Sequence, residues 1–382
     1  MINESGLRIK IARKIEEIPA QDWNKTYPFA VENYYFFKAL DESNLSQFSF
    51  FYILVYDNGT PVGAANCFIM DFSFDMAITG RFKKIAGLIK NLAPFLLNPR
   101  VLICGLPMGQ QGRLGITERP EAVLREIYEG MEQIAREEKA GVIVFKDFDI
   151  SYSETLGKCL DYGFFRIDSL PFGVIDINFT SFDDYLMTLS ADSRSNLRRN
   201  LRKTDGKVKI DFDITNSPDE GTLDRIYALY LQTCEKQKVG IEKVPIDLFR
   251  NISKNMPAET RFFLWRIDDK IVAFSLCLVS GDYFNEYYLG FDYSVAYQYH
   301  LYFVRFRDLV NWCIENKIKR YEMGPTGYEP KRRLGFNFIP LYIYVKHRNA
   351  LLNPIFKIFS RLLLQKLIRF FKARKQRPAQ KL

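Results

Sequence analysis

The sequence predicts a mixed α/β protein built from two copies of one unit, and three observations support this fold class. Short apolar strands alternate with helical periods through most of the 382 residues. A hairpin pattern occurs twice, at residues 51–70 and 261–279. After each hairpin the chain continues in the same order, as strand, loop, helix and strand, which indicates an internal repeat.

The first half is expected to span residues 1–178. Alternating apolar residues flank Asp57-Asn58-Gly59, as in a hairpin with a tight turn. Farther on, residues 120–139 repeat apolar side chains at helical spacing. The expected elements of this half are strands at 7–11, 51–56, 61–70, 101–105, 142–148 and 172–177, and helices at 120–139 and 154–162.

The second half is expected to span residues 179–346 and to begin with a helical insertion at 182–203. Its hairpin turns at Asp268-Asp269-Lys270 and matches the first hairpin in pattern. The expected elements that follow are strands at 261–267, 271–279, 283–291, 319–323 and 341–346, and a helix at 300–316.

Composition restricts the class of protein. Apolar residues make up 47% of the chain and aromatic residues 15%, which is typical of a globular protein. No run of 18 uncharged apolar residues occurs, and the start mixes charges of both signs, so we expect a cytoplasmic protein with neither spanning helix nor leader. The six cysteines are widely spaced and there are two histidines, which favours buried reduced thiols and no metal site.

The positive charge is concentrated in the tail, residues 347–382, which we expect to be a basic amphipathic helix. Residues 346–382 contain 11 lysines and arginines and no acid, against a net charge of +9 for the whole chain. Between 354 and 375, apolar residues lie mostly on one arc of a helix, and cations lie opposite. This pattern predicts peripheral contact with the inner membrane surface; a helix docked on its own domain and a nucleic-acid contact are the alternatives.

The helical insertion carries Arg194, Arg198 and Arg202 at spacing i, i+4, i+8, so the three guanidinium groups share one helix face. Such a row suits a phosphate or carboxylate partner. A solvated face, or pairing with nearby acids, is the structural alternative.

Residues 321–336 interrupt regular structure at the end of a predicted strand. They contain two carboxylates, Glu322 and Glu329, then Tyr328 and Lys331, with Gly324-Pro325 as a break. Ligands of α/β proteins usually bind at the carboxyl ends of strands, so this stretch is a candidate site, although an ordinary surface turn has the same composition.

With these features the chain resembles the acyl-CoA N-acyltransferase (GNAT) superfamily, in its tandem FemAB-like and CelD/BioF2-like branch. The resemblance rests on the duplicated unit, on Ser193-Arg194-x-x-Leu197-Arg198, and on the Gly324 to Phe336 stretch, and it covers roughly residues 8–345. It implies two tandem GNAT-like units and transfer of an acyl group from a thioester, or of an aminoacyl group from charged tRNA, onto an amine.

The resemblance also implies a donor site. In single-domain relatives a glycine-rich loop before the central helix holds the CoA pyrophosphate, because backbone N–H groups at a helix N-terminus stabilise phosphate charge. Here only the first half offers such a loop, with Gly109, Gly112 and Gly115. We therefore expect acyl-CoA as donor substrate, or an acyl carrier protein, which needs fewer nucleotide contacts.

Amide formation needs a proton acceptor for the amine and donors for the oxyanion and the leaving group. The candidate bases are, in order, Glu322, Glu286 and His300. Tyr328 is the candidate proton donor to the leaving thiolate, and Lys331 the candidate for stabilising the oxyanion. For each of them a strand-end ion pair is the structural alternative.

The basic tail and the many aromatic residues favour a lipid or cell-envelope amine as acceptor. Two alternatives remain at this point: an aminoacyl-tRNA-dependent transferase acting on an envelope precursor, in which tRNA is a partner, and a non-catalytic assembly protein of exopolysaccharide synthesis that keeps only the fold.

Overall fold

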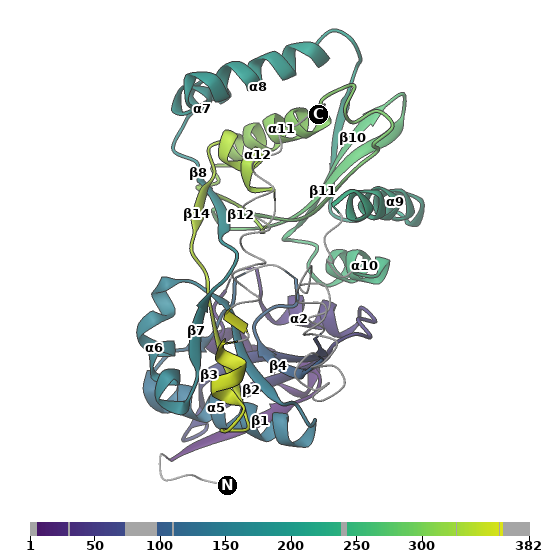
Figure 1. The fold of residues 1–382 in the computed structure, drawn as a ribbon. Coiled ribbons are helices and arrows are strands. Elements are labelled where there is room, and N and C mark those ends of the chain that lie inside the picture. The colour runs from purple at the N-terminus through teal and green to yellow at the C-terminus, as the bar shows by residue number, and fades with distance from the viewer. Residues whose placement is uncertain are drawn as a thin grey trace. The chain divides into compact units, whose positions relative to one another are not determined.

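The computed structural model describes residues 6–29, 31–72, 98–108, 111–237, 243–325, 327–358 and 360–361. They form two compact units, each built on one mixed sheet (Figure 1). Within the described residues, unit 1 comprises 6–29, 45–172 and 339–361, and unit 2 comprises 31–44 and 173–338.

Unit 1 has the strand order β1-β2-β3-β4-β6-β15-β7, with β5 paired to β3. β4 and β6 run parallel, and the neighbouring pairs are antiparallel. The strands are β1 Leu7–Ala12, β2 Ser49–Asp57, β3 Thr60–Asp71, β4 Arg100–Cys104, β5 Gly115–Ile116, β6 Val142–Phe148, β7 Phe165–Asp168 and β15 Tyr342–His347. The helices are η1 Ile15–Glu17, α1 Ala20–Thr26, α5 Pro120–Glu137, η3 Ile150–Tyr152, α6 Ser153–Gly157 and η4 Lys158–Tyr162.

Unit 2 repeats this order as β14-β8-β13-β12-β11-β10-β9, so that its parallel pair, β12 and β13, corresponds to β4 and β6. The strands are β8 Phe172–Asp176, β9 Asp211–Thr215, β10 Thr260–Ile267, β11 Lys270–Ser280, β12 Tyr283–Phe291, β13 Arg320–Met323 and β14 Asn337–Ile339. The helices are α2 Tyr34–Asp41, α7 Phe182–Thr188, α8 Ala191–Thr204, α9 Glu220–Gln237, α10 Ile246–Asn255, α11 Leu301–Glu315 and α12 Tyr328–Arg333.

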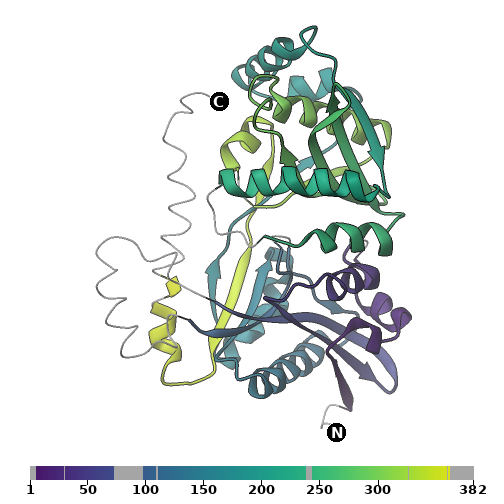
Figure 2. The ribbon, with the colours of Figure 1, turned by 90° about the vertical axis from the view of Figure 1, so that its right-hand side faces the viewer.

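Helices cover both faces of the sheet of unit 2 (Figures 1 and 2). On one face lies α11, with α7 and α8 packed against it. On the other face lies α9, which contacts β11 and β12. Gly290 of β12 permits this approach, because a Cβ there would come within 2.6 Å of the backbone of α9. Side chains that alternate along β12 therefore point to two different helical layers.

Both predicted hairpins are confirmed. β2 and β3 pair across Asn58 and Gly59, which have φ angles of 47° and 86°. β10 and β11 pair across Asp268 and Asp269, with φ angles of 48° and 62°. Two successive positive φ angles are those of the turn whose twist matches antiparallel strands, and Asn, Asp and Gly are the residues that adopt them most readily.

The sheets differ from the expected halves because they exchange strands. The strand expected to close the second half at 341–346 is β15, and it lies between β6 and β7 of unit 1. The strand expected in the first half at 172–177 is β8, and it pairs with β13 of unit 2. The boundaries 1–178, 179–346 and 347–382 therefore do not match the two units. The pattern of a short strand does not specify its pairing partner, which non-local packing decides.

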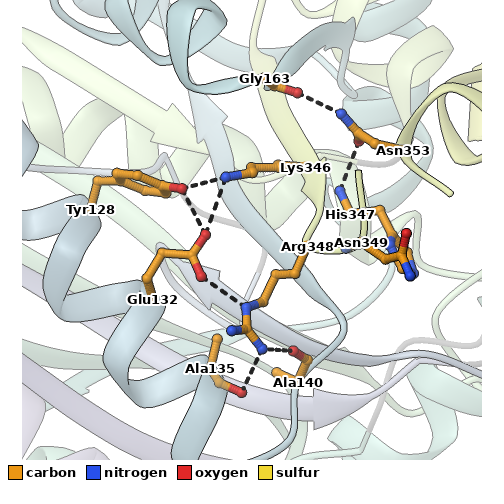
Figure 3. A network of polar contacts seen from close by, with 10 residues as sticks. All are labelled: Tyr128, Glu132, Ala135, Ala140, Gly163, Lys346, His347, Arg348, Asn349 and Asn353. Atoms are coloured by element: carbon orange, nitrogen blue, oxygen red, sulfur yellow. Dashed lines mark hydrogen bonds and ion pairs between the residues drawn. The ribbon is translucent and has the colours of Figure 1, made fainter. Parts of the chain in front are cut away.

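A polar network fixes β15 in unit 1 (Figure 3). Glu132 of α5 accepts hydrogen bonds from Lys346 Nζ at 3.2 Å and from Arg348 Nε at 2.8 Å. Burial alone would raise the pKa of Glu132, but hydrogen bonds from Tyr128, Arg348 and Lys346 outweigh burial and lower it. The ionised carboxylate of Glu132 therefore anchors β15 to α5.

The remaining structural expectations have mixed outcomes. All six cysteines are free, and five are buried, whereas Cys234 is half-buried. Residues 328–333 form a short helix, α12, where irregular backbone was expected, because Gly327, at φ 61°, turns the chain into it. No helix among the described residues is long and apolar enough to cross a membrane. The predicted tail helix is described only at 353–358 and 360–361; its other residues lie outside the described part.

Candidate functional site

The parallel strands of unit 2 separate at one point. β12 and β13 pair over Tyr283–Glu286 and Arg320–Met323, after which β12 continues to Phe291 on β11. The register with β11 shifts here, so that Tyr287 is an extra residue, a β-bulge. In the described chain, the last five residues of β12 thus have no strand on the side where β13 was. Such an opening between parallel strands is the usual ligand position in open α/β sheets.

In unit 1 the corresponding edge is filled by the protein's own chain. β4 and β6 pair only as far as Cys104 and Phe145. Beyond them, the N–H group of Gly112 donates to the Asp147 carbonyl at 2.8 Å, and Lys146 Nζ donates to the Leu106 carbonyl at 3.2 Å. The segment after β4 thus lies along the extension of β6, and only unit 2 presents an open edge within the described residues.

The predicted glycine loop belongs to this filling segment. A Cβ at Gly112 would lie 2.2 Å from the Lys146 carbonyl oxygen, and one at Gly115 would lie 2.0 Å from the Thr26 carbonyl oxygen. Both glycines thus allow the backbone to pack closely, and the Gly112 N–H group is already bonded. Gly109 lies outside the described residues. A phosphate-binding role for this loop stays a prediction that the geometry of Gly112 does not support.

Glu286 lies in a buried ionic network on the α11 face. Its side chain is 1% exposed and forms an ion pair with Arg305 of α11. Ser275 Oγ donates to the same carboxylate at 2.6 Å, and Tyr321 Oη donates to its other oxygen at 2.5 Å. Both oxygens are therefore occupied, and the geometry makes Glu286 a fixed charge that ties β12, β13 and α11 together.

The opposite face of β13 carries Glu322. Because Tyr321 points to α11, its neighbour Glu322 points to the face of α9. Glu322 is 5% exposed, and its carboxylate accepts a hydrogen bond from Arg320 Nε at 2.7 Å and lies 3.5 Å from Asn285 Nδ2. Glu322 therefore lies directly before the point where the two strands separate.

A second carboxylate contributes to this face. Tyr287 Oη, at the bulge, donates to Glu32 Oε1 at 2.8 Å. Burial, together with the negative charges of Glu32 and, more weakly, Glu322, raises the pKa of Tyr287 well above its usual value. Two buried carboxylates and a tyrosine hydroxyl that stays protonated thus surround the start of the open edge.

Lys331 of α12 lies at the end of β13. Lys331 is 5% exposed, and its Nζ donates to the carbonyl of Gly324, the residue that follows β13. Burial lowers the pKa of Lys331 to about 7; Glu286 opposes the shift and Arg305 adds to it. A lysine that changes charge near neutral pH, beside an opening between strands, is a candidate for proton or charge chemistry.

Tyr328 and His300 lie at helix starts. Tyr328 is the first residue of α12, and its ring packs against Phe338 at 5.3 Å. His300 precedes α11 in a left-handed conformation, with φ 47°. Burial, with Lys203 and Lys207, lowers the pKa of His300. The positive end of the α11 dipole thus coincides with two cations near His300, an arrangement that favours an anion.

The predicted arginine row lies within the continuous helix α8, so its i, i+4, i+8 spacing places the three side chains on one face, next to the buried face of Leu197, Asn200, Leu201 and Thr204. Arg194 donates to the Leu189 carbonyl at 3.3 Å, and Arg198 pairs with Asp183 at 3.5 Å. Arg202 is exposed and lies next to Lys203 in the last turn of α8. Thr204 Oγ1 donates to the Tyr299 carbonyl at 2.8 Å, which fixes this end beside the start of α11.

Two features of the candidate site were not predicted from the sequence. Arg305, fully buried, lies within the apolar helix 301–315, and an arginine among apolar helix positions was the available signal for a buried partner. The convergence of Lys203, Lys207 and His300 had no sequence signal, because the helix that brings them together is an insertion. Among the described residues, no cluster of three His, Cys, Asp or Glu side chains forms a metal site.

Comparisons with known proteins give one family and one fold. The FemAB-like family model, described as peptidoglycan biosynthesis/recognition, matches residues 14–361. The crystal structure of FemX is 12% identical, with a TM-score of 0.57 over 88% of this chain and 96% of that chain. L-PGS from Bacillus licheniformis is 12% identical, with a TM-score of 0.54 over 86% and 96%. A tandem GNAT protein from the clavulanic acid biosynthesis pathway is 10% identical, with a TM-score of 0.51 over 89% and 98%.

The comparison with curated proteins finds no match. At these identities the likeness to solved structures is a likeness of fold. The predicted class, two tandem GNAT-like mixed-sheet units, is confirmed.

Proposed function

Because the chain belongs to the FemAB-like family, whose description is peptidoglycan biosynthesis/recognition, we propose that it is an envelope-related transferase that moves an acyl group onto an amine. The proposed donor is acyl-CoA, or an acyl carrier protein, and the proposed acceptor is the amine of a lipid or cell-envelope precursor. The proposal places the reaction in unit 2.

One observation carries this proposal: β12 leaves β13 at Tyr287, directly beyond Glu322 and the Gly324 carbonyl that Lys331 binds, and the chain then leads from the end of β12 into α11. An extended donor arm can pair with the free edge of β12 as a strand would, through backbone hydrogen bonds. The reactive carbonyl of the donor would then reach the end of β13, near the side chains of Glu322 and Lys331.

The α11 N-terminus supplies the site proposed for the donor's phosphate groups. The positive end of the α11 dipole and the charges of Lys203 and Lys207 both stabilise a phosphate. This arrangement replaces the glycine-rich loop that unit 2 lacks, since residues 292–299 contain no glycine. Arg202 extends the basic surface toward a longer nucleotide.

The proposed mechanism assigns one role to each group. The amine nitrogen bonds to the thioester carbonyl carbon while its proton passes to the Glu322 carboxylate, directly or through one water. The ammonium form of Lys331 stabilises the oxyanion. The carbon–sulfur bond then breaks, and the thiolate takes the proton of Tyr328, which is restored from Glu322 through solvent.

Thiol release tests the proposal. Purified protein is mixed with acyl-CoAs of increasing chain length, with and without a long-chain amine in detergent micelles, and free thiol is measured. We expect release only when the amine is present, together with an amide product of matching mass. Absence of thiol and amide with every acyl-CoA and with acyl carrier protein would refute the thioester donor.

A second candidate, aminoacyl transfer from charged tRNA, is supported by the family match and by the basic surface around Lys203. A polynucleotide donor presents several phosphates, which the Arg202 end of α8 can contact beyond the start of α11. Transfer of a labelled amino acid from charged tRNA that ribonuclease abolishes would select this candidate. A non-catalytic assembly role predicts no turnover with any of the three donors.

A further inference from the structure

The last described helix of unit 1, residues 353–358 and 360–361, is attached to the unit by one face only; we call it the terminal helix. Phe356 is 3% exposed and packs in an apolar cluster of unit 1, with its ring 5.6 Å from that of His347. The side chain of Asn353 donates to the Gly163 carbonyl at 2.7 Å and accepts from the His347 N–H group at 2.9 Å (Figure 3). These contacts fix the orientation of the helix.

The opposite face is apolar and exposed. Leu351, Ile355 and Ile358 are 84%, 55% and 65% exposed. Ile355 and Ile358, three residues apart, lie on one side of the helix and the buried Phe356 and Ser360 on the other, while Leu351 lies in the turn directly before the helix. A helix whose only task was to cover its own unit would not carry this second apolar face, since exposed apolar groups grouped together mark interaction surfaces.

Cations accompany this face. Lys357 and Arg361 are exposed and lie four residues apart, on the flank of the apolar row. The sequence from 346 to 382 contains 11 lysines and arginines and no acid. A partner must therefore offer both an apolar layer and negative charge. A second copy of the chain brings the same positive charge, and a polynucleotide offers no apolar layer.

We propose that Leu351, Ile355 and Ile358 insert into the interfacial layer of an anionic lipid membrane, with Lys357 and Arg361 at the level of the headgroups. Apolar area and cations contribute together in such helices, which lie in the plane of the interface. The contact holds unit 1 at a lipid surface by its terminal helix. This inference does not depend on the proposed function, because it concerns binding alone.

Vesicle sedimentation tests the inference with the full-length protein and no substrate. Vesicles of phosphatidylcholine are compared with vesicles that contain phosphatidylglycerol, at low and at high salt. We expect sedimentation with the anionic vesicles only, weakened by salt. Ile355→Glu with Ile358→Glu should lower the partition coefficient at least about tenfold, because two charges would enter the apolar layer. Lys357→Glu with Arg361→Glu should lower it on anionic vesicles to a similar degree.

Ile150→Glu is the matched control, because Ile150 is a 57% exposed isoleucine of the same unit outside the terminal helix. It should leave the partition coefficient unchanged. Equal sedimentation of the Ile355/Ile358 variant and the parent protein would overturn the proposal, as would equal binding to neutral vesicles. A dimer in light scattering that this double substitution dissociates would also overturn it, because a second copy would then cover the face.

Discussion

Replacing Lys331 by methionine should stabilise unit 2 while it removes activity. Burial lowers the pKa of Lys331 to about 7, whereas an unfolded lysine has a pKa near 10.4. The unfolded state thus binds the proton more tightly between these values, and the stability of the parent protein rises with pH from about 7 to about 10.4. At pH 7 the difference costs the folded state about 4 kcal/mol.

Methionine fills a similar volume without a charge, so that this cost disappears. The substitution also removes the hydrogen bond to the Gly324 carbonyl, which costs about 1–3 kcal/mol. The expected net gain at pH 7 is about 2 kcal/mol, or roughly 4–8 °C in the unfolding temperature of a unit of this size. Substitutions that remove a charge from an active site commonly raise stability and lower activity.

Urea unfolding followed at pH 7 and pH 9 measures the effect. Between these pH values the parent protein should gain about 2 kcal/mol more than the Lys331→Met variant, because only the parent loses a buried proton. The activity of the parent should fall as pH rises through about 7, since the oxyanion role needs the ammonium form. A variant that is less stable than the parent at pH 7, with the same dependence on pH, would refute the reasoning.

Three further substitutions test the framework. Glu286→Ala should destabilise unit 2 by about 3–5 kcal/mol in denaturant unfolding, because it leaves the guanidinium of Arg305 buried without its partner. Glu286→Leu combined with Arg305→Met should recover most of this lost stability, and no recovery would contradict the assignment of a paired charge. Glu132→Ala should lower the free energy of unfolding by about 2–3 kcal/mol at pH 7, and this difference between variant and parent should vanish as pH falls through the lowered pKa of Glu132, because the carboxylate of the parent is then protonated. A difference that persists in acid would exclude the ionic contribution. Gly112→Ala should lower the unfolding temperature of unit 1, because the added Cβ would meet the Lys146 carbonyl oxygen at 2.2 Å, whereas Gly157→Ala in α6, where the space is open, should raise that temperature slightly. Equal effects of the two substitutions would show that the close contact at Gly112 is not needed.

Local patterns were sufficient to predict the elements of the fold. The hairpins follow from alternating apolar residues around Asn58-Gly59 and Asp268-Asp269, because both the turn and the strands are encoded within about twenty residues. The exchange of β8 and β15 between the sheets was beyond such patterns. Both strands are short and apolar, and their partners lie far away in sequence, β13 for one and β6 for the other.

The sequence predicted which residue types lie around the candidate site, and their roles stay predictions. Glu286, Glu322 and Lys331 do lie around the separation of β12 and β13, because a strand end and the turn after it place them there. The occupied oxygens of Glu286 depend on Arg305 of another helix, a contact that no local pattern contains. Gly112 has the spacing of a phosphate loop, yet its environment is a carbonyl oxygen of its own unit.

The central claim is that the transfer takes place in unit 2 and that the equivalent edge of unit 1 is filled by its own chain. The most direct test compares two lysines beside these edges, Lys331 of unit 2 and Lys146 of unit 1, each replaced by methionine, in the same turnover assay with saturating donor and amine. Folding of both variants is first verified by circular dichroism and thermal unfolding. We expect the Lys331→Met variant to lose about 100-fold or more of kcat, the effect of removing one oxyanion donor, and the Lys146→Met variant to keep the parent rate. Loss of turnover in the Lys146 variant with full activity in the Lys331 variant would place the reaction in unit 1 and contradict the account.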